Sequence, residues 1–128
     1  SGRVRRQARS VLVVDDEVAV QTLLRHFLEQ EKGYNVVTAG SVGEAISVLE
    51  HGPIDAVVLD VRMPRRSGLE LLEFIRWNER FRDLPVLILT GAALTPDEEA
   101  TIVRDRGYLF YKSENLEALA VQLYQLTG

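Results

Sequence analysis

Val11-Leu12-Val13-Val14-Asp15-Asp16-Glu17 is the stretch of sequence that decides the fold. Four apolar residues, mostly β-branched, follow one another and stop abruptly at a run of acids. A continuous apolar run of this kind is typical of a strand whose two faces are both buried. Such strands belong to parallel sheets covered by helices on both sides, so the run predicts an α/β protein.

The same signature recurs along the chain and alternates with helical patterns. Further strands are expected over 35–39, 56–59, 86–89 and 108–111. Apolar stripes at helical spacing predict helices over 20–28, 41–49, 69–75, 95–107 and 116–126. Strands separated by one helix each must be parallel, with right-handed crossovers that place helices on both faces. The prediction is a doubly wound parallel sheet of five strands with five helices.

Specific residues mark several of the helix ends. Ser41 and Glu44 have the spacing of a capping box, and Thr95 and Glu98 stand at the N-cap and third position of a later helix. Gly107 is expected to end that later helix.

Polar residues follow four of the expected strands at the point where each strand ends. They are Asp15 with Asp16, Asp60, Thr90 and Lys112. Parallel strands gather these residues at one edge of the sheet, where doubly wound folds have their functional crevice. Three carboxylates within about 5 Å of one another would repel by about 3 kcal/mol per pair, so a cation is needed to neutralise them.

The residue types at this edge suit a phosphoryl group. Mg²⁺ prefers carboxylate oxygens together with water and phosphate oxygens. A carboxylate can act as the nucleophile and form an aspartyl phosphate, while the cation, the ammonium group of Lys112 and the hydroxyl of Thr90 stabilise charge on the transferring group.

Composition limits the class of protein. The 128 residues are 46% hydrophobic, a size and content typical of one soluble domain, and no apolar run is long enough for a membrane span. The absence of cysteine fits a reducing compartment, so we expect a cytoplasmic protein. The net charge of −4 gives no electrostatic footprint for nucleic acid.

The amino-terminal residues 1–9 are expected to lie outside the domain, which would span 10–128. They carry several arginines among polar residues and are interpreted as a basic leader or linker. The initial Ser1-Gly2 is typical of an expression-tag remnant, so a longer parent protein with an output domain is plausible.

Over residues 10–127, the chain resembles the receiver domain of two-component response regulators. The stretches that carry the resemblance are Val11–Glu17, Leu59–Gly68, Leu87–Thr90 and Lys112. The resemblance implies a flavodoxin-like sheet with strand order 2-1-3-4-5.

The resemblance also implies roles for the acidic residues. Asp60 would be the phosphoacceptor and would also contribute to a Mg²⁺ site. Asp15 and Asp16 would be the acidic pair that serves Mg²⁺, and the backbone carbonyl of Arg62 would be a further metal ligand. The domain would then be no enzyme beyond catalysing its own phosphorylation and dephosphorylation.

The remaining roles concern signalling. Thr90 would bond a phosphoryl oxygen and Lys112 would pair with the phosphoryl group. The phosphoryl donor would be a phosphohistidine on a histidine kinase or phosphotransfer protein. Phosphorylation would shift the conformation of the face around the fourth helix and fifth strand, and a weak homodimer is a possible partner state.

Two alternatives stay open. A pseudo-receiver scaffold would keep the fold without phosphorylation, and it is favoured by Leu109 where the family usually has Phe or Tyr, and by Ser113 where Pro usually follows the Lys in a cis peptide. We expect a trans bond before Ser113. An aspartyl-phosphate phosphatase would need a second Asp two residues after Asp60, where Arg62 stands.

Aromatic residues outside the expected crevice are interpreted as packing residues. Trp77 and Phe81, near the end of the third helix, are expected to lie in the core or to be half-buried.

Overall fold

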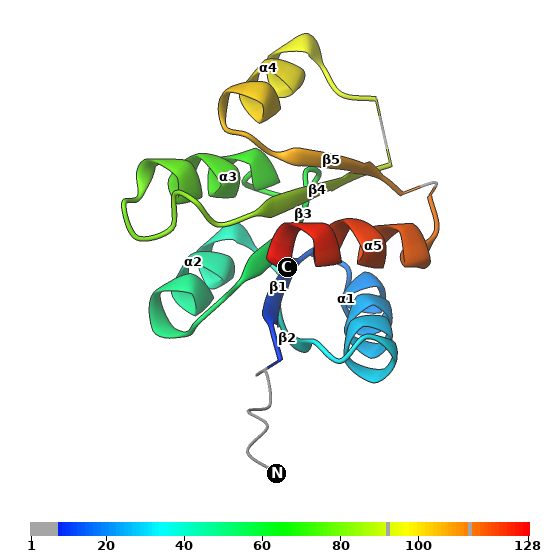
Figure 1. Cartoon of the computed structure of the whole chain (residues 1–128). Coiled ribbons are helices and arrows are strands. Elements are labelled where there is room, and N and C mark those ends of the chain that lie inside the picture. The colour runs from blue at the N-terminus through cyan, green and yellow to red at the C-terminus, as the bar shows by residue number, and fades with distance from the viewer. Residues whose placement is uncertain (1–7, 92, 113) are drawn as a thin grey trace.

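The computed structural model describes residues 8–91, 93–112 and 114–128 (Figure 1). Its strands are β1 (Ser10–Val14), β2 (Asn35–Ala39), β3 (Ala56–Asp60), β4 (Val86–Thr90) and β5 (Tyr108–Tyr111). Its helices are α1 (Val18–His26), the π-helix η1 (Phe27–Glu31), α2 (Val42–His51), α3 (Gly68–Trp77), α4 (Pro96–Arg104) and α5 (Leu116–Thr127). Within the described residues, no helix combines the length and apolar character that crossing a membrane requires. Of the expected leader 1–9, residues 1–7 lie outside the described residues.

The strands form one parallel sheet in the order β2-β1-β3-β4-β5. The predicted fold class and strand order are therefore confirmed. The order reverses beside β1, because β2 lies on one side of it and β3 on the other (Figure 1). Val14 pairs with Leu59, so the residues that follow β1 lie beside the end of β3.

Two apolar layers hold the helices against the sheet. Alternate strand residues such as Leu12 and Val57 face a buried cluster with α2, α3 and α4. Their neighbours Val11 and Val58 face a second cluster with α1, η1 and α5. Because both faces are covered, the central strands carry continuous apolar runs over 11–14, 56–59 and 86–89.

The first helix is longer and less regular than its pattern predicts. After His26 the α-helical geometry gives way to the π-helix η1, and Gly33 then adopts a left-handed backbone with φ of 74°. The apolar pattern marks Phe27 and Leu28 as buried, as they are, but it does not distinguish a π-helix from an α-helix over so few residues.

The capping predictions are confirmed for α4 and half wrong for α2. Thr95 and Glu98 form the complete reciprocal box. At α2 the Ser41 hydroxyl accepts the Glu44 N–H, but the Glu44 carboxylate accepts the N–H of Gly40 at 2.8 Å instead of that of Ser41.

The end of α4 differs from the prediction. The helix stops at Arg104, and the residue with a left-handed backbone is Arg106, with φ of 56°. Gly107 is required for another reason, since a Cβ there would lie 2.9 Å from Cγ1 of Ile88.

The expectation for Trp77 is wrong, and that for Phe81 is correct. Trp77 is 77% exposed, whereas Phe81 is partly buried against the core and its ring lies 6.2 Å from that of Phe74. The hydropathy of a residue at the end of a helix does not predict whether its side chain is buried, because much of the surface of a folded protein is apolar.

Candidate functional site

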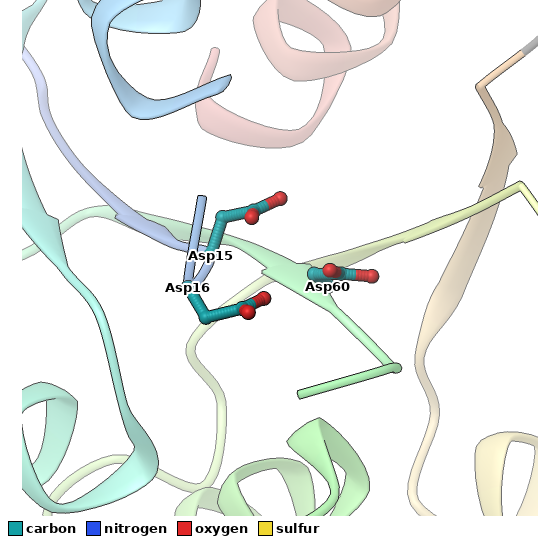
Figure 2. Close-up of side chains that lie close together, drawn as sticks. All are labelled: Asp15, Asp16 and Asp60. Atoms are coloured by element: carbon teal, nitrogen blue, oxygen red, sulfur yellow. The ribbon is translucent and has the colours of Figure 1, made fainter. Parts of the chain in front are cut away.

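Three carboxylates meet at the carboxyl edge of the sheet. Asp15 and Asp16 follow β1, and Asp60 is the last residue of the neighbouring strand β3. One oxygen from each lies within 4.8 Å of the others. Figure 2 shows the side chains of Asp15 and Asp16 extending toward the side on which Asp60 lies. Asp15 and Asp60 are buried, with 1% and 5% exposure, and Asp16 is nearer the solvent.

The two side-chain oxygens of Asp15 differ in their hydrogen bonding. Its Oδ1 accepts the Glu17 N–H at 2.8 Å, while among the described residues its buried Oδ2 has no partner. Burial raises the pKa of the Asp15 carboxyl; the Glu17 N–H opposes this shift and the nearby Asp60 charge adds to it. A buried carboxylate oxygen without a donor, beside two further acids, fits a hard cation.

The ammonium group of Lys112 and the backbone N–H of Arg62 both face the Asp60 carboxylate. Its Oδ1 lies 3.7 Å from Nζ of Lys112 and accepts the N–H of Arg62 at 3.2 Å. Burial raises the pKa of the Asp60 carboxyl, while Lys112 and the Arg62 N–H both lower it. Lys112 is placed by the backbone, since its N–H donates to the Thr90 carbonyl at 2.9 Å.

Thr90 ends β4, next to the strand that carries Asp60. It is buried, and its position is one residue beyond Leu89, the register partner of Asp60. On the other side Thr90 pairs with Tyr111, the residue before Lys112. The sheet register therefore brings the last residues of β3, β4 and β5 to the same edge.

A glycine allows the loop after β3 to return to this edge. The N–H of Gly68 donates to the carbonyl of Val61, and a Cβ on Gly68 would lie 2.0 Å from the carbonyl oxygen of Asp60. Only glycine can begin α3 this close to the strand that carries Asp60.

The side chain of Arg62 makes contacts that the sequence did not indicate. Its guanidinium extends to the start of α4, where it pairs with both carboxylate oxygens of Glu98 and donates to the Ala93 carbonyl at 2.9 Å. The two residues are 36 positions apart, and no sequence pattern joins them. The expectation of a trans bond before Ser113 concerns a residue outside the described part of the chain.

Residues 11–123 match the family described as the response regulator receiver domain. The chain belongs to this family, whose members act in two-component signalling. The predicted family is confirmed, and phosphorylation-dependent switching is what membership implies.

Individual relatives agree with this assignment. The polar-differentiation response regulator DivK of Brucella ovis is 34% identical over 107 residues, which cover 83% of this chain and 84% of DivK. The transcriptional regulatory protein YvrH of Bacillus subtilis is 37% identical over 89 residues, 70% of this chain but 36% of YvrH. The chain thus spans about a third of the length of that regulator.

One similar solved structure contains Mg²⁺ and BeF. The response regulator protein TrrA of Thermotoga maritima, in complex with Mg²⁺ and BeF, is 32% identical and superposes with a TM-score of 0.81, covering 92% of this chain and 98% of TrrA.

Proposed function

We propose that this domain is a phosphorylation switch in which the Asp60 carboxylate accepts a phosphoryl group. The observation that carries the proposal is the cluster of Asp15, Asp16 and Asp60, in which Asp15 and Asp60 are buried and Lys112 lies 3.7 Å from Asp60. Among the described residues, one buried oxygen of Asp15 also lacks a hydrogen-bond partner. The pairwise repulsion in such a cluster is a cost that a purely structural role would not explain.

The transfer begins at a carboxylate oxygen of Asp60. That oxygen attacks the phosphorus of a phosphohistidine on a histidine kinase or phosphotransfer protein, and an O–P bond forms while the N–P bond breaks. The electron pair of the broken bond stays on the imidazole nitrogen, which takes up a proton. Lys112 stabilises the negative charge of the phosphoryl oxygens, and Thr90 donates its hydroxyl to one of them.

The residues present fit Mg²⁺. Asp15, Asp16, Asp60 and the backbone carbonyl of Arg62 would hold it, since they supply the oxygen ligands that this ion prefers. When bound, it would offset the charge of the carboxylates and of the phosphoryl group. Oδ2 of Asp15, which has no hydrogen-bond partner in the described part of the chain, supports this assignment.

The output of the switch is a change in the face formed by α4 and β5. A phosphoryl group adds a charge of about −1.5 to −2 at the end of β3, beside Thr90 and Lys112 at the ends of β4 and β5, and shifts the population of pre-existing arrangements. A cytoplasmic location fits a histidine kinase as donor, and an output domain in a longer parent fits the partial coverage of YvrH.

Incubation with Mg²⁺ and acetyl phosphate, followed by intact mass measurement, tests the proposal. We expect one phosphoryl group on the wild-type protein and none on Asp60→Asn. Repeated turnover of small phosphate esters would instead favour a phosphatase. Absence of both activities would favour the pseudo-receiver scaffold.

A further inference from the structure

Arg62 connects the phosphoacceptor to the start of α4. At one end its backbone N–H donates to Oδ1 of Asp60 at 3.2 Å. At the other end its guanidinium holds the Glu98 carboxylate in a two-pronged pair, with Nη2 at 2.9 Å from Oε1, and reaches the Ala93 carbonyl. We call the contacts of Arg62 with Ala93 and Glu98 the Arg62 clamp.

Glu98 is part of the structure that begins α4. Its Oε1 accepts the Thr95 N–H at 2.8 Å, and its own N–H donates to the Thr95 hydroxyl at 3.1 Å. The Glu98 side chain is 17% exposed, against 48% for Arg62. The Arg62 clamp is therefore attached to the capping box that fixes the first turn of α4.

A phosphoryl group at Asp60 would compete with Glu98 for the guanidinium. Arginine carries five donors in a fork that fits carboxylate and phosphate alike. The phosphoryl charge of about −1.5 to −2 exceeds the single charge of Glu98. Arg62 follows Asp60 by two residues, and its flexible side chain is long enough to serve either anion.

We propose that Arg62 is a positioning residue that exchanges partners on phosphorylation. With Asp60 as a free carboxylate, the guanidinium holds Glu98 and the Ala93 carbonyl. With Asp60 phosphorylated, it moves to the phosphoryl oxygens and releases the first turn of α4. This inference rests on the proposed function, because it requires a phosphoryl group on Asp60.

The exchange makes opposite predictions for the two partners of the pair. Phosphorylation must break the pair with Glu98, so by linkage the loss of that pair favours the phosphorylated arrangement. Glu98→Gln frees the guanidinium and keeps an oxygen for the capping box. Arg62→Gln removes the clamp and also the group that would bind the phosphoryl oxygens.

The experiment is an equilibrium titration with beryllofluoride, a phosphoryl mimic, in the presence of Mg²⁺. We expect Glu98→Gln to bind beryllofluoride about 5- to 20-fold more tightly than the wild type and Arg62→Gln to bind it about 5-fold or more weakly, within the usual range of coupling between sites. The matched control is Glu99→Gln, which removes the same charge from the same turn of α4 and should stay within about twofold of the wild type.

Shifts in the same direction for Glu98→Gln and Arg62→Gln would overturn the exchange, as would an equal gain in Glu98→Gln and Glu99→Gln. Thermal melts of all variants show whether each is folded, and Arg62→Lys, which keeps the charge but loses the fork, replaces Arg62→Gln if that variant does not fold. Failure of the wild-type protein to bind beryllofluoride at all would instead refute the proposed function itself.

Discussion

Nζ of Lys112 lies 3.7 Å from Oδ1 of Asp60, although β4 separates β3, which ends at Asp60, from β5, which Lys112 follows. The contact exists because Lys112 follows the end of β5 and extends past Thr90 along the edge of the sheet. A positive charge is thus held at the place where the proposed phosphoryl oxygens would carry negative charge.

Lys112→Met should slow phosphorylation by acetyl phosphate about 100-fold, since it removes a preorganised charge and keeps much of the aliphatic chain. The rate is measured by intact mass over time. Lys32→Met is the matched control: Lys32 pairs with Glu117, and its loss should leave the rate unchanged. Equal rates for wild type and Lys112→Met would contradict the role assigned to Lys112.

Mg²⁺ should stabilise the folded protein through Asp15. At ten times its dissociation constant, a ligand specific for the folded state adds about 1.4 kcal/mol to the free energy of unfolding. We expect this gain in thermal melts of the wild type and its loss in Asp15→Asn. Glu79→Gln, which removes an exposed carboxylate just after α3, should keep the full gain. A normal Mg²⁺ response in Asp15→Asn would exclude Asp15 as a ligand.

Without divalent ions, the carboxylate cluster should favour stability at lower pH. Burial raises the pKa values of Asp15 and Asp60 in the folded state, so the folded protein binds more protons than the unfolded chain above the unfolded pKa near 3.8. The contribution of these groups to stability therefore increases as pH falls from neutrality through their raised pKa values, and is lost as pH rises.

Urea unfolding in EDTA at pH 7 and pH 5 measures this effect. Asp60→Asn should be more stable than the wild type at pH 7, and the difference should shrink at pH 5. Asp97→Asn, at an exposed position in α4, should show no such change. A difference between wild type and Asp60→Asn that grows on acidification would show that the sign is wrong.

The sequence predicts correctly which residues gather at the carboxyl edge of the sheet, because the strand topology alone brings the strand ends together. Asp15 and Asp60 follow apolar runs that only a two-sided parallel sheet explains, and parallel strands place their carboxyl ends at one edge. That rule brings Asp15, Asp16, Asp60 and Lys112 to the same edge, where the structure then shows their side chains close together.

The contacts that sequence reasoning misses depend on side-chain reach between distant segments. Glu98 is recognisable as a capping residue from its spacing to Thr95, but nothing in that local pattern shows that its second oxygen pairs with Arg62. Trp77 is a similar case, since its exposure depends on where α3 ends relative to the core rather than on its own hydropathy.

Substitution of Gly68 tests whether the close approach of α3 to β3 is needed for stability. A Cβ at this position would lie 2.0 Å from the Asp60 carbonyl oxygen, so Gly68→Ala must push the start of α3 away from β3. We expect a loss of about 3 kcal/mol in the free energy of unfolding, measured by urea titration, because the obstacle is backbone and cannot rotate away.

The matched control for this change is Gly43→Ala. Gly43 lies in the first turn of α2, and a Cβ there would meet no atom of the described residues within 4 Å. The same substitution should therefore stabilise the protein by about 0.5 kcal/mol through helix propensity. Similar stabilities for the two variants would mean that the loop after β3 can move away from Asp60 at little cost, and that it does not hold the Asp60 backbone in place.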